Sequence, residues 1–231
     1  MSIGFISKDF YNGLFDNNTA LNLRKLEGDG LVSELKGPFG SGKEALVFYT
    51  RSLDNLECAV KIHRYSINPF KKIPQYMRIR RKKVVNNLSI INVWTSYEYK
   101  YLLKSYNLGI KVPKPYRQYK NIIVMKFLGY NGIPAPLLNE INDFDKERVY
   151  SILLDSIKKM AKAGYTHGDL SAYNIMYFEN EPYIIDFSQS VKITPSTKDY
   201  LIKDINNLNA FFKEIKTEPV EKILKEVGLF E

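Results

Sequence analysis

The chain has 231 residues, 45% of them apolar, and a formal net charge of +9 at pH 7. This length and composition allow one sizeable core or two small lobes and exclude a largely disordered chain. The positive excess favours an anionic partner such as nucleic acid, a nucleotide or an acidic surface, although a protein that is simply basic would carry the same charge.

Cys58 is the only cysteine and the chain has two histidines, so an intramolecular disulfide is excluded and a zinc site is disfavoured. The sequence contains no run of about 20 apolar residues, the length that a membrane helix needs. We therefore expect neither a signal peptide nor a membrane span, and a cytoplasmic location.

The first half of the chain is predicted to be mostly β-structure. A short helix is expected over residues 18–27, with Asn18 or Thr19 as its N-cap. Short apolar runs separated by polar turns then predict strands at 31–35, 45–49 and 57–62, with a glycine-rich loop at 37–42 and a polar turn at 51–55. Three consecutive short strands indicate an antiparallel meander.

A helix and two further strands follow, and the second half is predicted to be mainly helical. The helical spacing of Trp94, Tyr97, Tyr101 and Leu102 predicts a helix over residues 93–106. The remaining predicted elements are strands at 116–119 and 122–127, a Gly/Pro-rich crossing at 129–136, a helix at 146–163 ending at Gly164, a hairpin of strands 175–178 and 183–185, and a helical tail from residue 198.

This order of elements predicts an α+β chain of two lobes with a cleft between them. We expect an N-terminal helical extension over residues 1–36, packed on the lobes that follow. An N-lobe is expected over 37–128, with a basic loop at 64–92, and a helical C-lobe over 129–231.

The most informative motif lies after the long helix, where residues 167–174 read HGDLSAYN. Its Asp169 and Asn174 are five positions apart, as in the catalytic loop of protein kinases. In that loop the Asp accepts or orients the proton of the substrate hydroxyl, and the Asn holds a magnesium ion. Gly168 stands where the kinase pattern has an arginine.

A second carboxylate is predicted to lie beside Asn174. If the following hairpin turns around Asn180, residues whose numbers sum to about 360 face each other, which places Asn174 opposite Asp186. Asn174 and Asp186, with Asp169 nearby, then supply oxygen ligands for a hard cation. Asp186 also has the position of the metal-binding aspartate of kinases. The alternative is that Asp186 only ends a strand and caps a turn.

A lysine–glutamate pair is predicted in the first half. Lys61 follows Ala59-Val60 in a strand, close to the kinase V-A-I-K pattern, and Glu98 falls on the apolar stripe of its helix. A carboxylate that faces a core is costly unless it is paired. Lys61 is the expected partner, with its ammonium directed at the α- and β-phosphates of ATP. The alternative is that Glu98 turns out to solvent.

The glycine-rich loop matches most of the Walker A pattern but lacks its end. Glu44 stands where that pattern needs Ser or Thr, and a strand rather than a helix is expected next. A glycine-bearing hairpin over the phosphates fits better, with Ser41, Gly42 and Lys43 as phosphate contacts. Farther on, Met125, Lys126 and Leu128 occupy the place of a hinge that binds adenine through backbone groups, although a plain strand and turn has the same pattern.

Together these motifs resemble the RIO family of atypical serine protein kinases, type-1 branch, whose fold is a truncated form of the two-lobed protein-kinase fold. The resemblance rests on GKEA at 42–45, HGDLSAYN at 167–174, IIDFSQSV at 184–191, PAPLL at 134–138 and KDINNLNAFF at 203–212. Two further segments, KIHR at 61–64 and VPKP at 112–115, are similar to the type-2 branch.

The resemblance implies an ATP-dependent serine/threonine kinase, an ATPase, or both, with Mg²⁺ or Mn²⁺ as its metal. It also implies a role in maturation of the small ribosomal subunit, autophosphorylation on serine, and transient transfer of the phosphoryl group to Asp186. The implied partners are the pre-small-ribosomal-subunit particle and its ribosomal RNA. Three alternatives stay open: a conventional protein-serine kinase with a dedicated substrate, a Bud32-type kinase or ATPase, and a pseudokinase that only binds nucleic acid.

A basic segment from residue 64 to 83 accounts for most of the net charge, with no acidic residue in it. We expect it to contact RNA phosphates, with Ser66 or Ser89 as the autophosphorylation site; a solvated loop is the simpler alternative. Its basic residues are Arg64, Lys71, Lys72, Arg78, Arg80, Arg81, Lys82 and Lys83.

Overall fold

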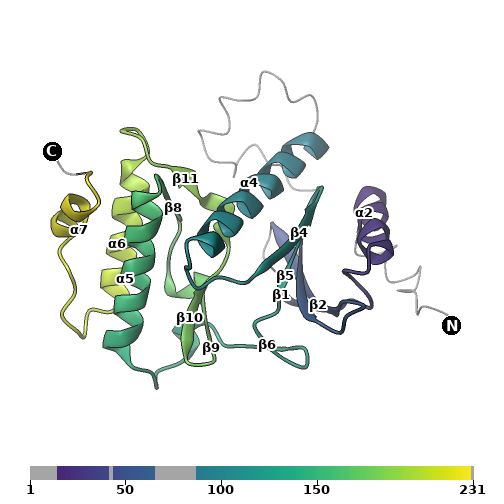
Figure 1. Cartoon of the computed structure of the whole chain (residues 1–231), viewed down its shortest axis with the longest axis horizontal. Coiled ribbons are helices and arrows are strands. Elements are labelled where there is room, and N and C mark those ends of the chain that lie inside the picture. The colour runs from purple at the N-terminus through teal and green to yellow at the C-terminus, as the bar shows by residue number, and fades with distance from the viewer. Residues whose placement is uncertain (1–14, 42–43, 66–86, 230–231) are drawn as a thin grey trace. The chain divides into compact units, whose positions relative to one another are not determined.

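The computed structural model describes residues 15–41, 44–65 and 87–229 (Figure 1). The chain divides into two compact units, one formed by Met1–Lys100 and Lys114–Pro134 and the other by Tyr101–Pro113 and Ala135–Glu231. Among the described residues, no helix has both the length and the apolar character that crossing a bilayer requires.

A five-stranded antiparallel sheet organises the first unit, with the strand order β1-β2-β3-β5-β4. The strands are β1 (Lys36–Ser41), β2 (Ala45–Arg51), β3 (Glu57–His63), β4 (Pro115–Tyr119) and β5 (Ile122–Lys126). The predicted antiparallel meander is confirmed, as β1, β2 and β3 are neighbours in chain order.

The first strand differs from its prediction. Residues 31–35 form no strand, whereas most of the predicted loop at 37–42 belongs to β1. Val32 and Leu35 are buried in the core cluster without strand pairing, so their apolar character reflects packing alone. The pairing of β1 with β2 is irregular between Lys36 and Gly40, and an edge strand tolerates a proline because one side of it needs no partner.

Helix α2 (Asn17–Gly28) shares its core cluster with the sheet through Leu23 and Leu26. Its N-cap is Asp16, whose Oδ1 accepts hydrogen bonds from the backbone N–H groups of Asn18 and Thr19 at 3.0 Å. The predicted caps, Asn18 and Thr19, were therefore wrong, since the carboxylate of Asp16, two residues before Asn18, accepts from the first free N–H groups of the helix.

Helix α4 (Asn87–Asn107) is longer than predicted and runs from the first unit into the second. This helix was predicted to begin at residue 93. Ile91 is fully buried three positions before Trp94, so the apolar stripe extends one turn upstream. The hairpin of β6 (Gly129–Tyr130) and β7 (Ile133–Pro134) closes the first unit.

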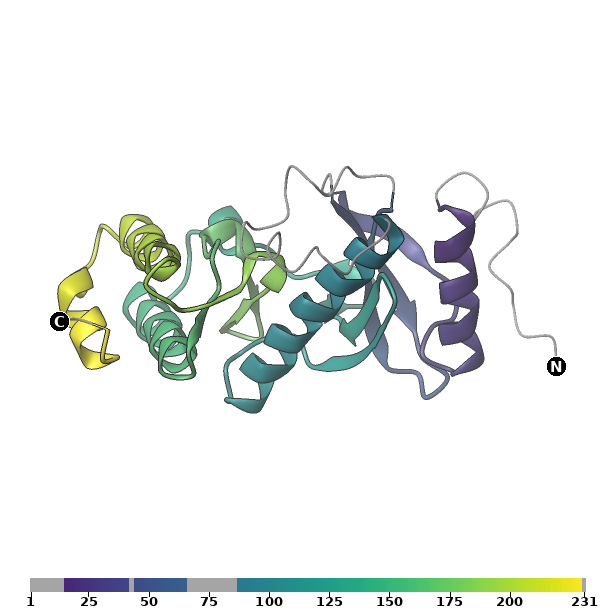
Figure 2. The same cartoon turned by 90° about the horizontal axis from the view of Figure 1, so that it is seen from above.

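The second unit contains helices α5 (Lys146–Lys162), α6 (Lys198–Phe211) and α7 (Val220–Glu226). Helices α5 and α6 lie side by side (Figure 2) and bury Leu153 and Ile157 from one and Leu201 and Ile205 from the other. Gly164 follows α5 with φ 82°, which confirms its predicted role as the helix stop.

The second unit also contains two short antiparallel ladders and, besides η3 (Leu138–Glu140), two single-turn helices. They are β9 (Ile175–Phe178) with β10 (Glu181–Ile184), β8 (Tyr165–Thr166) with β11 (Val191–Lys192), η4 (Ala172–Asn174) and η5 (Phe187–Gln189).

Candidate functional site

Lys61 and Glu98 form a buried ion pair. Lys61 Nζ lies 2.6 Å from Glu98 Oε1, and the two side chains are 8% and 4% exposed. Lys61 comes from β3, paired on both sides in the sheet, and Glu98 from α4, so both backbones are held by regular structure. The predicted pair is confirmed, and the alternative that Glu98 faces solvent was wrong. A pair this buried requires good geometry, because each charge has lost its hydration.

His63 contacts the other oxygen of the same carboxylate, a residue that sequence reasoning did not single out. Its Nε2 lies 2.8 Å from Glu98 Oε2, and its ring packs on Trp94 with centroids 5.3 Å apart. Residues two positions apart on a strand share a face, so the position of His63 relative to Lys61 was the signal available in the sequence.

The candidate phosphate-binding loop is described only in part. Ser41 is the last residue of β1 and faces Leu46 of β2. Gly42 and Lys43 lie outside the described residues. What is established is an antiparallel connection from β1 to β2, which confirms that a strand, not a Walker-type helix, follows the loop.

The candidate hinge begins at the end of β5. Met125 pairs with Ala59, and the N–H groups of Lys126 and Phe127 donate to Lys114 O at 2.8 Å and Glu57 O at 3.1 Å. These two amides already bond within the sheet, which limits the hinge groups that could face a base. Leu128 is buried.

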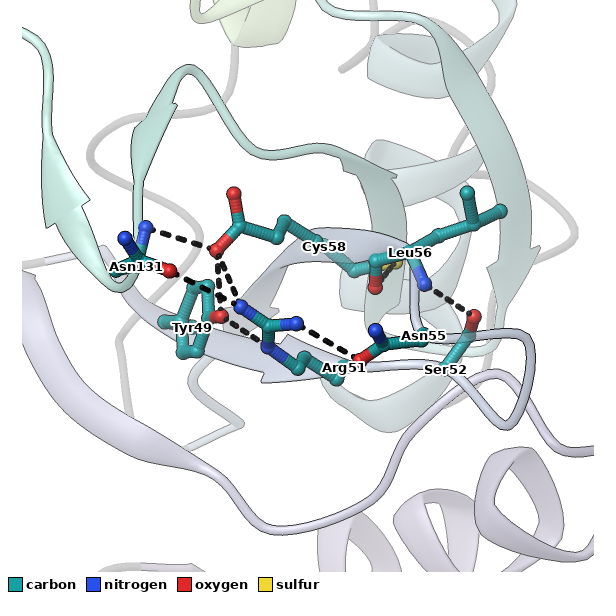
Figure 3. A network of polar contacts seen from close by, with 8 residues as sticks. Tyr49, Arg51, Ser52, Asn55, Leu56, Cys58 and Asn131 are labelled. Carbon is teal, nitrogen blue, oxygen red and sulfur yellow. Dashed lines mark hydrogen bonds and ion pairs between the residues drawn. The ribbon is translucent and has the colours of Figure 1, made fainter.

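A polar network holds the hairpin that follows the hinge. Glu57 Oε1 accepts from Tyr49 Oη at 2.7 Å, from Arg51 Nη2 at 3.2 Å and from the backbone N–H of Asn131 at 2.9 Å. Figure 3 shows Arg51 reaching from Tyr49 to Asn55, with Asn131 on the other side. The network joins β2 and β3 to the β6–β7 turn.

In the second unit, the loop after β8 carries Asp169 and Asn174. Asn174 Nδ2 donates to the backbone oxygen of Asp169 at 2.8 Å, so the two ends of the motif are joined. Gly168 has φ 84°, and a Cβ added there would lie 2.4 Å from Gln189 O. The arginine of the kinase pattern is therefore excluded at this position by backbone contact and by conformation.

Asp204 of α6 holds this loop by its main chain. The carboxylate is fully buried and accepts from Thr166 Oγ1 at 2.5 Å, Gly168 N at 2.7 Å and Leu170 N at 2.8 Å. Sequence reasoning placed Asp204 in a family motif but gave it no role. Its position in that motif was the only available signal.

The preceding residue on α6, Lys203, contacts Asp169 itself. Lys203 Nζ lies 2.9 Å from Asp169 Oδ1, with side chains 53% and 49% exposed. The hydrogen bond to Asp169 raises the pKa of Lys203. Helix α6 thus holds the backbone of the loop through Asp204 and the side chain of Asp169 through Lys203.

The β9–β10 hairpin has a register one residue different from the prediction. The numbers of paired residues sum to 359, as for Ile175 and Ile184. Asn174 is therefore opposite Ile185 rather than Asp186, and the N–H of Ile185 donates to Asn174 O at 2.9 Å. The turn is Glu179-Asn180, both with positive φ, which is the two-residue type that matches strand twist.

Asp186 follows the last paired residue and has a left-handed backbone, with φ 62° and ψ 74°. Its Oδ1 accepts from the N–H of Ser188 at 3.2 Å, so Asp186 does cap a turn, as in the alternative to a metal-binding role. His167 braces the same turn: its Nε2 donates to Ile185 O at 3.0 Å and its ring contacts Phe187. A non-glycine residue in this conformation is strained, and such strain gathers at functional positions.

Asn174 and Asp186 fit a magnesium ion by their donor atoms. Because Asn174 Nδ2 is used by Asp169 O, its Oδ1 is the atom left to act as a ligand. No group of three or more His, Cys, Asp or Glu side chains among the described residues forms a complete metal cage. Mg²⁺ needs none, since it takes one or two protein ligands together with phosphates and waters.

Of the two candidate autophosphorylation sites, Ser66 lies outside the described residues, as does the basic segment beyond Tyr65. Ser89 is in the first turn of α4 and is partly buried.

A family model described as the RIO domain matches residues 46–224. The chain belongs to the RIO family. The RIO-type serine/threonine-protein kinase Rio1 of Methanocaldococcus jannaschii is 37% identical over 214 residues, covering 90% of this chain and 72% of that one. The serine/threonine-protein kinase rio1 of Dictyostelium discoideum is 35% identical over 92% of this chain, which spans only 39% of that protein. The predicted type-1 resemblance is confirmed.

A solved RIO kinase structure has the same fold as this chain. The Rio2 kinase of Chaetomium thermophilum, solved as a complex with ADP, Mg²⁺ and phosphoaspartate, superposes with a TM-score of 0.71 at 21% identity, covering 92% of this chain and 66% of that one. This likeness confirms the predicted kinase-like α+β fold. The relatives named above are both serine/threonine-protein kinases.

Proposed function

We propose that this RIO protein transfers the γ-phosphoryl group of ATP to a serine or threonine hydroxyl, its own included, with Mg²⁺ as the metal. The observation that carries the proposal is the buried Lys61–Glu98 pair. A buried lysine–carboxylate pair adds little to folding stability, because the loss of hydration offsets the attraction between the charges. Its presence is therefore better explained by a function, and in kinases such a pair binds the α- and β-phosphates of ATP.

In the proposed step, the hydroxyl oxygen attacks the γ-phosphorus, the bond to the β–γ bridging oxygen breaks, and ADP leaves. Asp169 orients the hydroxyl and takes up its proton. Asn174 and Asp186 hold the magnesium ion, which when bound neutralises charge on the phosphates. Mn²⁺, which accepts the same oxygen ligands, is a candidate substitute.

A variant of this function uses Asp186 as the first acceptor and water as the second, which would make the protein an ATPase. The phosphoaspartate in the Chaetomium thermophilum Rio2 complex supports it. Here the carboxylate oxygen of Asp186 attacks the γ-phosphorus, ADP leaves, and hydrolysis restores the carboxylate. Trapping with borohydride followed by mass spectrometry would identify the adduct, and its absence during turnover would exclude this route.

The test of phosphoryl transfer is Asp169→Asn. We expect loss of ATP turnover and of autophosphorylation, with nucleotide affinity largely kept, because Asp169 acts on the acceptor hydroxyl. A matched control is Asp199→Asn, an exposed carboxylate on α6. Equal activity of Asp169→Asn and the wild-type protein would exclude the assignment.

We further propose that the chain acts on the pre-small-ribosomal-subunit particle and contacts its RNA through the basic segment. The net charge of +9 and the concentration of lysine and arginine between residues 64 and 83 support this partner. Co-sedimentation with particles, with and without ATP, tests it directly. Replacing Arg80, Arg81, Lys82 and Lys83 by Ala should flatten the log–log salt dependence of RNA affinity by up to about 3.

A conventional kinase with a dedicated protein substrate is the second candidate. Labelled phosphate on one particle protein would favour it, whereas ATP turnover stimulated by particles without such transfer would favour an ATP-driven switch. The serine that carries the autophosphate, with Ser66 and Ser89 as candidates, is identified in the same experiment by mass spectrometry.

A further inference from the structure

Both oxygens of the Glu98 carboxylate are bonded to residues of one strand. Oε1 lies 2.6 Å from Lys61 Nζ and Oε2 lies 2.8 Å from His63 Nε2. Because the two contacts are made from alternate positions of β3, they fix both the rotation of the carboxylate and the distance of α4 from the sheet. Lys61 alone would leave that rotation free.

The hydrogen bond to His63 has a defined direction. A carboxylate can only accept, so His63 Nε2 carries the proton and donates it to Oε2. His63 is 1% exposed, and its Nδ1 has no hydrogen-bond partner among the described residues. Among the described residues, Glu98 is thus the polar partner of the His63 side chain. The ring also packs against Trp94, which is an apolar contact.

The backbone of His63 is held as firmly as its side chain. The pairing of β3 with β5 ends at Ile62 and Ile122, and Asn121 continues it: His63 N donates to Asn121 O at 2.9 Å and Asn121 Nδ2 donates to His63 O at 2.8 Å. Asn121 is fully buried and is itself held by Thr19 Oγ1 at 2.9 Å and Asn22 Nδ2 at 2.9 Å from α2.

We propose that His63 is a positioning residue for nucleotide binding: it holds Glu98 so that Oε1 stays on Lys61 and directs the ammonium at the phosphates of ATP. The inference rests on the proposed function of the Lys61–Glu98 pair. Fixed geometry is what the pair needs, because a lysine has a long side chain with many rotamers and only an oriented carboxylate selects one of them.

The experiment compares His63→Leu, which removes the donor and keeps the volume roughly, with His63→Gln, whose amide nitrogen replaces Nε2. We expect His63→Leu to lower nucleotide affinity and kcat/KM for ATP about tenfold, the effect of losing one hydrogen bond to a charged group. His63→Gln should restore most of it. The melting temperature of each variant shows whether it is folded.

A double-mutant cycle separates positioning from general packing. If His63 acts through Glu98, His63→Leu should cost little further affinity or turnover when it is added to Glu98→Gln. An equal loss in both backgrounds, or a Gln variant no better than Leu, would overturn the proposal. If His63→Leu does not fold, His63→Gln is compared with His63→Asn, whose shorter side chain cannot reach Oε2, and equal activity of these two would also overturn it.

The same variants distinguish a failure of the proposed function from a failure of the role proposed for His63. A wild-type protein that neither binds nor turns over ATP contradicts the proposed function. A Glu98→Gln variant that loses activity beside a fully active His63→Leu variant contradicts only the role of His63.

Discussion

The carboxylate of Asp204 accepts a hydrogen bond from the backbone N–H of Gly168 at 2.7 Å. A buried charge on helix α6 thereby holds the residue immediately before Asp169. The same carboxylate also accepts from Thr166 and Leu170, on both sides of Gly168. Three donors on one carboxylate balance its burial, and they fix the main chain of the loop rather than any reacting group.

Replacing Asp204 by Asn should destabilise the protein by about 2–4 kcal/mol, because an amide has one accepting oxygen and its NH₂ group would face a backbone N–H. ATP turnover should fall at least tenfold. Urea unfolding and a turnover assay below the transition measure the two effects. The exposed Asp199→Asn on the same helix is the control, and a variant of Asp204 with unchanged stability would contradict this account.

Gly168→Ala should be more harmful than Gly164→Ala. Both glycines have a left-handed backbone, with φ 84° and 82°, so each alanine costs about 1–2 kcal/mol from conformation alone. A Cβ at Gly164 meets nothing within 4 Å, whereas one at Gly168 lies 2.4 Å from Gln189 O. We therefore expect turnover to be lost only in Gly168→Ala. Equal melting temperatures for the two variants would show that the contact relaxes without cost.

Lys203→Met tests the contact between α6 and the Asp169 carboxylate. The pair is about half exposed, so unfolding free energy should change by less than about 1 kcal/mol, while turnover should fall roughly two- to fivefold. Lys198→Met, on the first turn of α6, is the comparison. An unchanged kcat at low salt would mean that Lys203 does not influence Asp169.

The titration of Lys203 gives this contact a pH range. Its pKa is raised by the hydrogen bond to Asp169, so the ion pair is present below the ordinary pKa of a lysine and is lost as pH rises through the raised value. Loss of the Lys203 contribution is thus expected only in strongly alkaline solution, and the difference between the wild-type protein and Lys203→Met should be constant across neutral pH.

Cys58 should react with iodoacetamide only when the protein unfolds. The thiol is 1% exposed in β3, and burial raises its pKa from 9.0 to about 11. Because the folded protein favours the protonated thiol, the contribution of Cys58 to stability is full below pH 9 and is lost as pH rises towards about 11. Mass spectrometry of labelling at pH 8, with and without urea, measures this, and rapid labelling without urea would place Cys58 at the surface.

Local patterns predicted the elements on which the site stands. Strand β3 and helix α5 follow from short-range periodicity and from a glycine stop, and Lys61 and Glu98 could be paired because a carboxylate on an apolar stripe demands a cation. A turn centred on Asn180 was predicted, but the turn consists of Glu179 and Asn180, so the predicted register was one residue off; the sequence does not show which two residues of a turn take positive φ.

The sequence by itself therefore determined the candidate catalytic residues, which are Asp169 and Asn174 at their spacing of five, the following Asp186, and the lysine of β3. Only the tertiary structure decided what holds them. His63 meets Glu98 across 35 positions, and Asp204 meets Gly168 across 36. Hydrogen bonds of this kind depend on packing a helix against a sheet or a loop, and the periodicity of a single segment contains no information on which face of a distant element will meet it.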